Sequence, residues 1–136
     1  MHLCNMTIVF EQQIEVKDSD LDDLNHVNNV VYLQWVQDVA KAHWAVLSNE
    51  DINRKYAWVV LRHEINYHRP AKLGDVLTVR TWVGETAGFR SIRHVEILDS
   101  MQGKIVTAQT TWCLIDAVTF KPAKINDEIL KSLIPA

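Results

Sequence analysis

Hydrophobic positions divide the 136-residue chain into one helical segment and several strand-like segments. Between Asn28 and Leu47 most apolar residues stand three or four positions apart, which is the spacing of a single helix face. Val30, Leu33 and Trp44 widen this apolar stripe. We therefore expect a long helix that is covered on most of its sides.

Strand-like segments fill most of the remaining chain, and β-branched residues mark both ends of the first of them. The predicted strands cover residues 7–16, 58–68, 75–85, 89–100 and 104–116. The last two are joined by Met-Gln-Gly, a glycine turn of hairpin length. Asn126 is a plausible N-cap for a short closing helix over residues 126–134.

This order of elements is a strand, a long apolar helix and then four strands in a meander. A helix that is apolar on nearly all sides needs a partner, and a curved antiparallel sheet is the partner that the other segments offer. The chain has no repeat and no interdomain linker. We therefore expect a single α+β domain over residues 1–136, with the sheet wrapped around the helix.

Composition narrows the function. Hydrophobic residues make up 48% of the chain and the formal net charge is −3, so neither nucleic acid nor an anionic membrane is an expected partner. The N-terminus has no basic segment followed by a sustained apolar run, which argues against a signal peptide. The two cysteines, Cys4 and Cys113, do not form a disulfide framework, and Cys113 is expected to be a buried thiol. These features favour a cytoplasmic enzyme or binding protein.

Polar and charged side chains cluster where the long helix begins, in SDLDDLNHVNNVVYLQW at residues 19–35. The first turn of a helix exposes unpaired N–H groups, and these stabilise an oxyanion that develops during acyl transfer. We expect the donors among the backbone N–H groups of residues 27–29. Asp22 lies on the approach loop, where its carboxylate is placed to act as nucleophile or as base on water. His26 is placed to orient a group or carry a proton.

The same residues have structural interpretations. Aspartates before a helix usually cap it, and Asn28 is a candidate N-cap. His26 is equally a candidate for a structural hydrogen bond at the turn. A metal site at Asp18, Asp20, Asp22 and His26 is not expected, because the sixth and twelfth positions of an EF-hand loop would hold Asp23 and Asn29.

Three stretches resemble the hot-dog-fold acyl thioesterases, namely the 4-hydroxybenzoyl-CoA thioesterase-like family and the acyl-ACP thioesterases. The first is D-x-D-x-x-x-H-V-N-N-x-x-Y-x-x-W, which runs from Asp20 to Trp35. The second is INYHRPAKLGD at residues 65–75, and the third is VTFKPAKINDEI near the C-terminus. The resemblance implies a hot-dog fold, in which a curved antiparallel sheet surrounds one central helix. It also implies homodimers or homotetramers whose active sites lie at the subunit interface.

The resemblance carries roles onto single residues. Asp22 matches the catalytic carboxylate, Asn29 stands where a main-chain N–H binds the thioester carbonyl, and His26 matches a histidine of the acyl-ACP branch. Asn25 replaces a common glycine, and asparagine tolerates the left-handed backbone that the turn requires. Leu24 stands where the acyl-ACP branch has an asparagine.

The resemblance also implies a carboxylate on the central helix in many members. Here that position holds Gln37, and only Asp38 lies nearby.

Hydrolysis of an acyl thioester, with acyl-CoA favoured over acyl-ACP, is the first hypothesis. No cofactor and no metal is expected, because a thiolate leaves readily. The expected substrate contacts are Val27, Asn28, Tyr32, Trp35 and Trp58. Candidate contacts for the CoA phosphates, each of which is also a candidate solvated strand end, are Arg69, Lys72, Arg90, Arg93 and Lys104. Two alternatives stay open: hydration or dehydration of an acyl thioester, and non-catalytic acyl-thioester binding.

Overall fold

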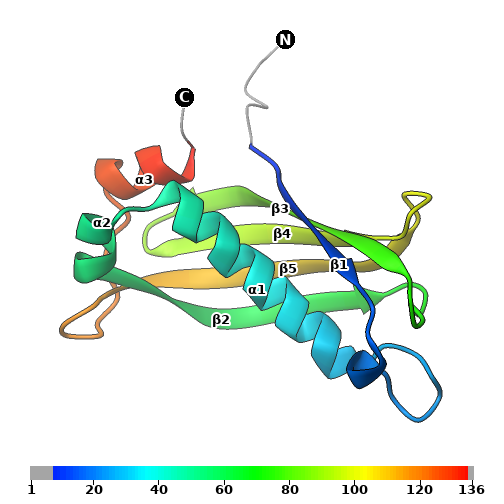
Figure 1. Cartoon of the computed structure of the whole chain (residues 1–136). Coiled ribbons are helices and arrows are strands. Elements are labelled where there is room, and N and C mark those ends of the chain that lie inside the picture. The colour runs from blue at the N-terminus through cyan, green and yellow to red at the C-terminus, as the bar shows by residue number, and fades with distance from the viewer. Residues whose placement is uncertain (1–7, 135–136) are drawn as a thin grey trace.

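The computed structural model describes residues 8–134 and has a five-stranded antiparallel sheet with a long helix across one face (Figure 1). The strands are β1 (Phe10–Glu15), β2 (Tyr56–Tyr67), β3 (Val76–Ala87), β4 (Arg90–Leu98) and β5 (Lys104–Asp116). The helices are η2 (Asp18–Asp20), α1 (Asn29–Leu47), α2 (Glu50–Lys55) and α3 (Asp127–Leu133). The predicted α+β arrangement is therefore confirmed.

The sheet order is β1-β3-β4-β5-β2, which differs from the predicted four-strand meander. Only β3, β4 and β5 follow one another as neighbours, while β2 pairs with β5 at the far edge. After β2 the chain returns to the opposite side of the sheet, where the Val16 N–H donates to the Asp75 carbonyl over 2.9 Å. The connection over residues 68–75 therefore crosses one end of the sheet.

Helix α1 buries one face against the sheet and leaves the other open, so the expectation that most of its sides are covered is wrong. Trp35, Val36 and Val39 are at most 8% exposed, whereas Val30 and Val46 are about 70% exposed. An open sheet that lies on one side of a helix covers only the side chains that point toward it. The open face carries Gln34, Asp38 and Lys41 beside Val30, so it is largely polar.

The core has two parts, one along each half of α1. The first contains Tyr32 and Trp35 together with the alternating positions Leu77 and Val79 of β3. The second lies at the other end and includes Ile52 of α2, Leu114 of β5 and Ile129 of α3. The first part packs behind the polar loop at the start of α1, and it is therefore the part that positions the loop.

Local signals account for the ends of several elements. Asn28 caps α1 by accepting from the Val30 N–H at 3.0 Å, and Asn126 caps α3 by accepting from the Ile129 N–H at 3.0 Å. Asp99 Oδ1 accepts from the Gly103 N–H at 2.8 Å and closes the predicted hairpin between β4 and β5. Helix α2 was not predicted, although Asn49 caps it in the same way.

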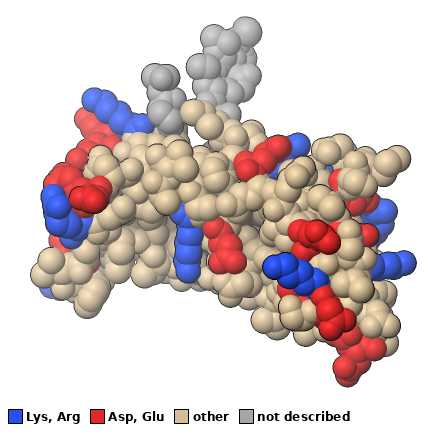
Figure 2. Space-filling view, in the orientation of Figure 1, with Lys and Arg blue, Asp and Glu red and all other residues tan. Residues whose placement is uncertain are grey.

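Acidic and basic side chains are interspersed over the face shown in Figure 2, as the small net charge leads one to expect. Within residues 8–134, no helix is long and apolar enough to cross a membrane. Cys113 is buried, as expected, and Cys4 lies outside the described residues.

Candidate active site

Asp22 opens a tight turn that fixes its own carboxylate. Its Oδ1 accepts from the N–H groups of Leu24 at 2.8 Å and His26 at 3.1 Å, and its N–H donates to the His26 carbonyl at 2.7 Å. Asn25 takes the left-handed conformation, with φ of 61°, as its replacement of glycine requires. Both side-chain hydrogen bonds end on Oδ1. Oδ2 accepts no hydrogen bond from the described part of the chain and is free to meet a ligand.

The start of α1 leaves one backbone donor unused. The Val27 N–H donates to the Ala71 carbonyl at 3.0 Å, and the Asn28 N–H donates to the Asp20 carbonyl at 2.9 Å. These two amides therefore do not serve as oxyanion donors in this conformation. The Asn29 N–H has no acceptor among residues 8–134 and lies at the positive end of the helix dipole. The expected set of three donors is reduced to Asn29.

Tyr32 and Ala71 join the first motif to the second. The Ala71 N–H donates to the Tyr32 hydroxyl at 2.9 Å, while the Ala71 carbonyl holds the Val27 N–H. Ala71 is completely buried and Tyr32 is 2% exposed. Burial raises the pKa of the Tyr32 phenol, and the negative charges of Asp75 and Asp22 act in the same direction. The second motif therefore supports the loop that carries Asp22.

The remainder of the second motif shapes the crossing connection. Gly74 has φ of 84°, a conformation that side chains disfavour, and its N–H donates to the Val16 carbonyl at 3.1 Å. Asp75 Oδ2 accepts from the Lys72 N–H at 2.9 Å and closes the turn. Arg69 forms an ion pair with Asp99 of the β4–β5 hairpin. These contacts explain why arginine, glycine and aspartate occur at those places in the motif.

The structure brings most of the predicted residues together and separates one from the rest. Leu21 and Val27 form a β-bridge, which places Asp22 and His26 beside the first turn of α1. Trp35 lies in the core and contacts Tyr32 edge to face, with ring centres 5.7 Å apart. Trp58 lies in the second core at the other end of α1, against Trp44. A single acyl group would have to follow the helix to reach both tryptophans.

The proposed phosphate contacts divide into three groups. Arg93 is only 6% exposed, so its assignment as a surface contact for CoA phosphates is wrong. The alternation of β4 turns Ser91, Arg93 and Val95 toward α1 and away from solvent. Arg69 and Lys104 pair with carboxylates, whereas Lys72 and Arg90 are exposed.

Sequence reasoning missed a polar contact between α1 and β2. Gln37 Nε2 lies 3.4 Å from His63 Nε2, and His63 Nδ1 lies 2.8 Å from the Thr110 hydroxyl. Burial lowers the pKa of His63, which favours the neutral imidazole. His63 is half-buried, as are Val60 and Ile65 of the same strand, and a histidine among these apolar positions was the available signal.

Within residues 8–134, no three histidine, cysteine, aspartate or glutamate side chains are grouped closely enough to hold a metal ion. The loop offers a fixed carboxylate, and the first turn of α1 that follows it offers a free amide proton. That combination suits attack on a carbonyl carbon whose oxygen becomes negative.

Two solved thioesterase structures have a fold similar to that of this chain. The fold is similar to that of a 1,4-dihydroxy-2-naphthoyl-CoA thioesterase from Synechocystis, with a TM-score of 0.80, 20% identity and coverage of 92% of this chain and 95% of that chain. It is also similar to YbaW, a probable thioesterase from Escherichia coli, with a TM-score of 0.78, 30% identity and coverage of 91% and 98%. The chain therefore has the hot-dog fold of the thioesterases.

Sequence comparison agrees with the fold. A family model described as the acyl-ACP thioesterase N-terminal domain matches residues 7–133. The long-chain acyl-CoA thioesterase FadM of Escherichia coli strain K12 is 33% identical over 129 residues, which cover 90% of this chain and 96% of FadM. The chain belongs to the acyl-ACP thioesterase family, and it is an acyl thioester hydrolase.

Proposed function

We propose that the protein hydrolyses acyl-CoA thioesters, with Asp22 as the catalytic carboxylate and the Asn29 N–H as the donor that stabilises the oxyanion. The observation that carries the proposal is the pairing of a fixed carboxylate with the unused amide at the start of α1. The turn holds Oδ1 in place, and Oδ2 is left for the substrate or for water. Metal chemistry is not required, because a thiolate is a good leaving group.

Asp22 has two routes to hydrolysis. As nucleophile, Oδ2 attacks the thioester carbon, the C–S bond breaks to release thiolate, and water then cleaves the mixed anhydride. As base, Asp22 takes a proton from water while the resulting hydroxide attacks the same carbon, and the C–S bond then breaks to release thiolate. In both routes the carbonyl oxygen becomes negative and faces the Asn29 N–H. An acyl-enzyme adduct detected by mass spectrometry under single-turnover conditions distinguishes the first route from the second.

The remaining predicted residues have supporting roles in this proposal. Asn28 caps α1 and keeps the first turn in register, so that the next amide points at the substrate. The Val27 main chain and the Tyr32 hydroxyl hold the loop through Ala71. His26, on the same turn as Asp22, orients the attacking water or carries a proton away.

Coenzyme A is the carrier that we favour. The support comes from FadM, which is a long-chain acyl-CoA thioesterase and matches this chain over nearly its whole length. Lys72 follows the buried Ala71 in the second motif and is exposed, so it is a candidate for a phosphate contact. The family model, in contrast, is that of acyl-ACP thioesterases, which makes acyl-ACP the alternative carrier.

The proposal also covers the oligomeric state of the protein. β2 is an edge strand, and its Val59 and Leu61 side chains are 38% and 50% exposed. An unpaired edge with apolar side chains is a template for pairing with a second copy. We propose a homodimer or homotetramer, with the open face of α1 near the partner subunit, in the cytoplasm. Light scattering coupled to size exclusion measures the assembly, and Leu61→Lys should shift it toward monomer.

A panel of acyl-CoA and acyl-ACP substrates with detection of the released thiol tests the proposal. We expect turnover of acyl-CoA thioesters at micromolar enzyme, with higher kcat/KM than for the matching acyl-ACP. Enoyl and 3-hydroxyacyl thioesters are included to detect hydration or dehydration without thiol release. Binding of acyl-CoA with no thiol released from any substrate would contradict the proposal and support a binding module.

A further inference from the structure

A pocket of about 320 Å³ lies at the end of α1 that is remote from Asp22. Its walls include the aromatic rings of Trp44, Trp58 and Trp112. The first pocket residue on α1 is Ala40, about 16 Å along the helix axis from Asn29 at a rise of ~1.5 Å per residue. A volume of this order and a largely apolar lining are typical of small-molecule sites.

A buried guanidinium lies in this pocket without a counter-ion. Arg93 is 6% exposed, and its Nη1 donates to His43 Nδ1 at 2.8 Å and to the Thr81 hydroxyl at 3.2 Å. Within the described residues, no carboxylate lies within ion-pair distance of Arg93. The N–H groups on Nε and Nη2 make no hydrogen bond there either. An arginine offers five such donors, so most of this one is unused.

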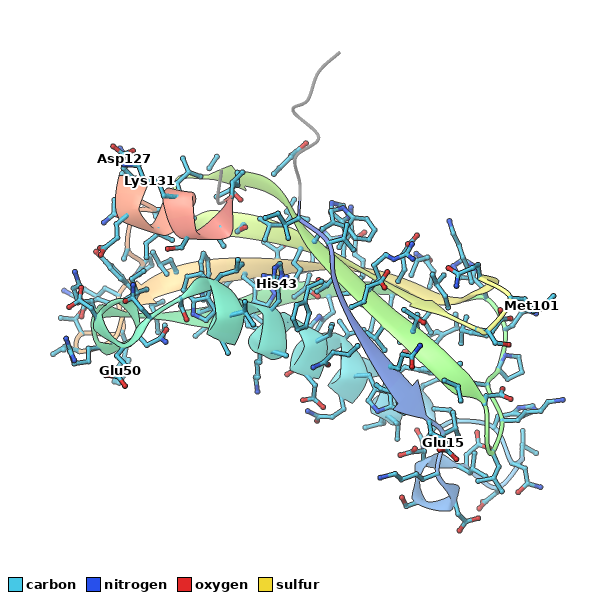
Figure 3. All side chains as sticks on the ribbon, turned by 45° about the horizontal axis from the view of Figure 1, so that its top comes forward. Glu15, His43, Glu50, Met101, Asp127 and Lys131 are labelled. Atoms are coloured by element: carbon cyan, nitrogen blue, oxygen red, sulfur yellow. The ribbon has the colours of Figure 1, made fainter. Side chains whose placement is uncertain are left out.

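The neighbours of Arg93 do not neutralise its charge. His43 points from α1 into the space between the helix and the sheet (Figure 3). Burial and the charge of Arg93 lower the pKa of His43 to about 4, so the imidazole is neutral and accepts on Nδ1. Burial also lowers the pKa of Arg93, to about 10, which leaves it protonated near neutral pH. Arg93 therefore brings an uncompensated positive charge to the pocket.

A second donor without an acceptor lies on the adjacent strand. Trp112 of β5 pairs with Ser91 of β4, and Ser91 is two residues from Arg93 along β4. The Trp112 Nε1 is buried and has no hydrogen-bond partner among the described residues. Buried polar groups are normally paired, so the Trp112 N–H calls for an acceptor, and the unused Arg93 N–H groups lie in the wall of the same pocket. Lys41 also lines the pocket, at an exposed position, and adds positive charge there.

We propose that this pocket binds the carboxylate of an apolar or aromatic carboxylic acid, with the Arg93 guanidinium pairing with its oxygens and the Trp112 indole N–H as a second donor. Arg93 suits this group because its planar fork matches the two oxygens of a carboxylate. Trp44 and Trp58 contact the apolar body of the acid. A strongly hydrated phosphate ester would have little to gain from such walls.

Two kinds of ligand would supply the carboxylate that binds Arg93. Their identification rests on the proposed function. One is the free acid that thioester hydrolysis releases, which would bind after leaving Asp22. The other is the far end of a dicarboxylic acyl group whose thioester carbonyl is still at Asn29. An extended acyl group of roughly 16 Å reaches from the first turn of α1 to Ala40. Binding of free acid and selectivity in hydrolysis separate the two sources.

Isothermal titration of the full chain with decanoate and 2-naphthoate tests the binding, with decanol as the uncharged control. We expect saturable binding of the acids that is at least tenfold tighter than that of decanol. Arg93→Met should weaken acid binding about 10- to 100-fold, the usual range for losing a charged hydrogen-bonding partner. Arg62→Met is the matched control, because Arg62 is exposed and already pairs with Glu64 at 2.8 Å. It should bind the acids as the wild type does.

Trp112→Phe is the second variant, because it removes the indole N–H and keeps one six-membered aromatic ring; decanol binding by the same variant accounts for the smaller side chain. The substitution should weaken acid binding several-fold even if Arg93→Met fails to fold. Equal affinity for decanoate and decanol in the wild type, or unchanged acid affinity in both variants, would overturn the proposal. These titrations need no turnover, so absence of thiol release from every thioester would refute the proposed function and leave this result standing.

Hydrolysis kinetics then identify the source. The ratio of kcat/KM for dodecanedioyl-CoA to that for dodecanoyl-CoA is measured in the wild type and in Arg93→Met. A ratio that falls at least tenfold in the variant supports the distal carboxylate as the ligand. An unchanged ratio, together with Arg93-dependent binding of decanoate, supports the free acid.

Discussion

Asp22 and His26 hold each other through the main chain. The Asp22 carboxylate accepts from the His26 N–H at 3.1 Å, and the His26 carbonyl accepts from the Asp22 N–H at 2.7 Å. Any residue except proline supplies these two backbone groups at position 26, so the geometry of the carboxylate does not require the imidazole. The structural and chemical contributions of His26 are therefore separable by substitution.

His26→Gln should retain the turn and the melting temperature, because the backbone hydrogen bonds are unchanged. If the imidazole carries a proton or orients water, kcat should fall about 10²-fold, the low end for general acid–base groups. Unchanged kcat in a folded variant would mean that His26 contributes only its backbone hydrogen bonds.

Tyr32→Phe tests the link between the two motifs. The substitution removes the acceptor of the Ala71 N–H, and Ala71 is completely buried. An unsatisfied buried donor costs about 1–3 kcal/mol, so the free energy of unfolding in urea should fall by that amount. Tyr67→Phe is the control, since Tyr67 is 47% exposed, and it should change stability little. Equal stability of the two variants would mean that the Tyr32 hydroxyl does not support the loop.

Asn29→Pro removes the proposed oxyanion donor without removing the helix start. Proline is favoured at the first helical position, and Asn28 already has the extended conformation that must precede proline, with φ of −66° and ψ of 138°. We expect a folded protein whose kcat is about 10²- to 10³-fold lower, as for loss of one oxyanion donor. Asn29→Ala keeps the N–H and should retain most of the activity. Comparable activity in both variants would exclude this amide as the donor.

The buried His43 predicts how stability depends on pH. Its pKa is lowered from 6.5 to about 4 in the fold, so only the unfolded chain takes up a proton between these values. Stability is therefore fully present above pH 6.5 and falls toward pH 4, by at most about 3 kcal/mol. His43→Gln keeps an acceptor for Arg93 but does not titrate. Urea unfolding at several pH values should show a smaller acid loss in the variant; identical losses would contradict this origin.

Local signals predicted much of the fold. The three- and four-residue spacing identified α1 to within one residue of its observed ends, and Asn28 and Asn126 proved to be caps. In the strand predicted over residues 75–85, the alternating positions Leu77, Val79, Thr81 and Val83 are the buried ones. Such patterns are read from neighbouring residues, and so they are visible in the sequence.

Long-range arrangement was harder to predict. Nothing in the sequence of β2 indicates that it pairs with β5 and not with β3, because strand order depends on contacts far apart in the chain. The coverage of α1 was overestimated for the same reason, since apolar content does not say which face meets the sheet. Arg93 is different: the alternation of Ser91, Arg93 and Val95 was a readable signal that this arginine faces inward.

The candidate site, like the fold, could be predicted from the sequence only in part. The motif predicts Asp22 and Asn29 as site residues, and their roles stay predictions. The hydrogen bonds that occupy the Val27 and Asn28 amides depend on the carbonyls of Ala71, far along the chain, and of Asp20. Ala71 carries no chemistry of its own in the sequence. Its role depends on main-chain groups, which a one-dimensional pattern does not describe.

Asp22→Asn is the most direct test of the central claim. Asparagine retains an Oδ1 that accepts from the Leu24 and His26 N–H groups, so the melting temperature should stay close to that of the wild type. Asp23→Asn, at the exposed neighbouring position, is the control. We predict that thiol release from acyl-CoA falls by about 10²- to 10⁴-fold in Asp22→Asn and stays near the wild-type rate in Asp23→Asn. Undiminished turnover in a folded Asp22→Asn protein would contradict the account.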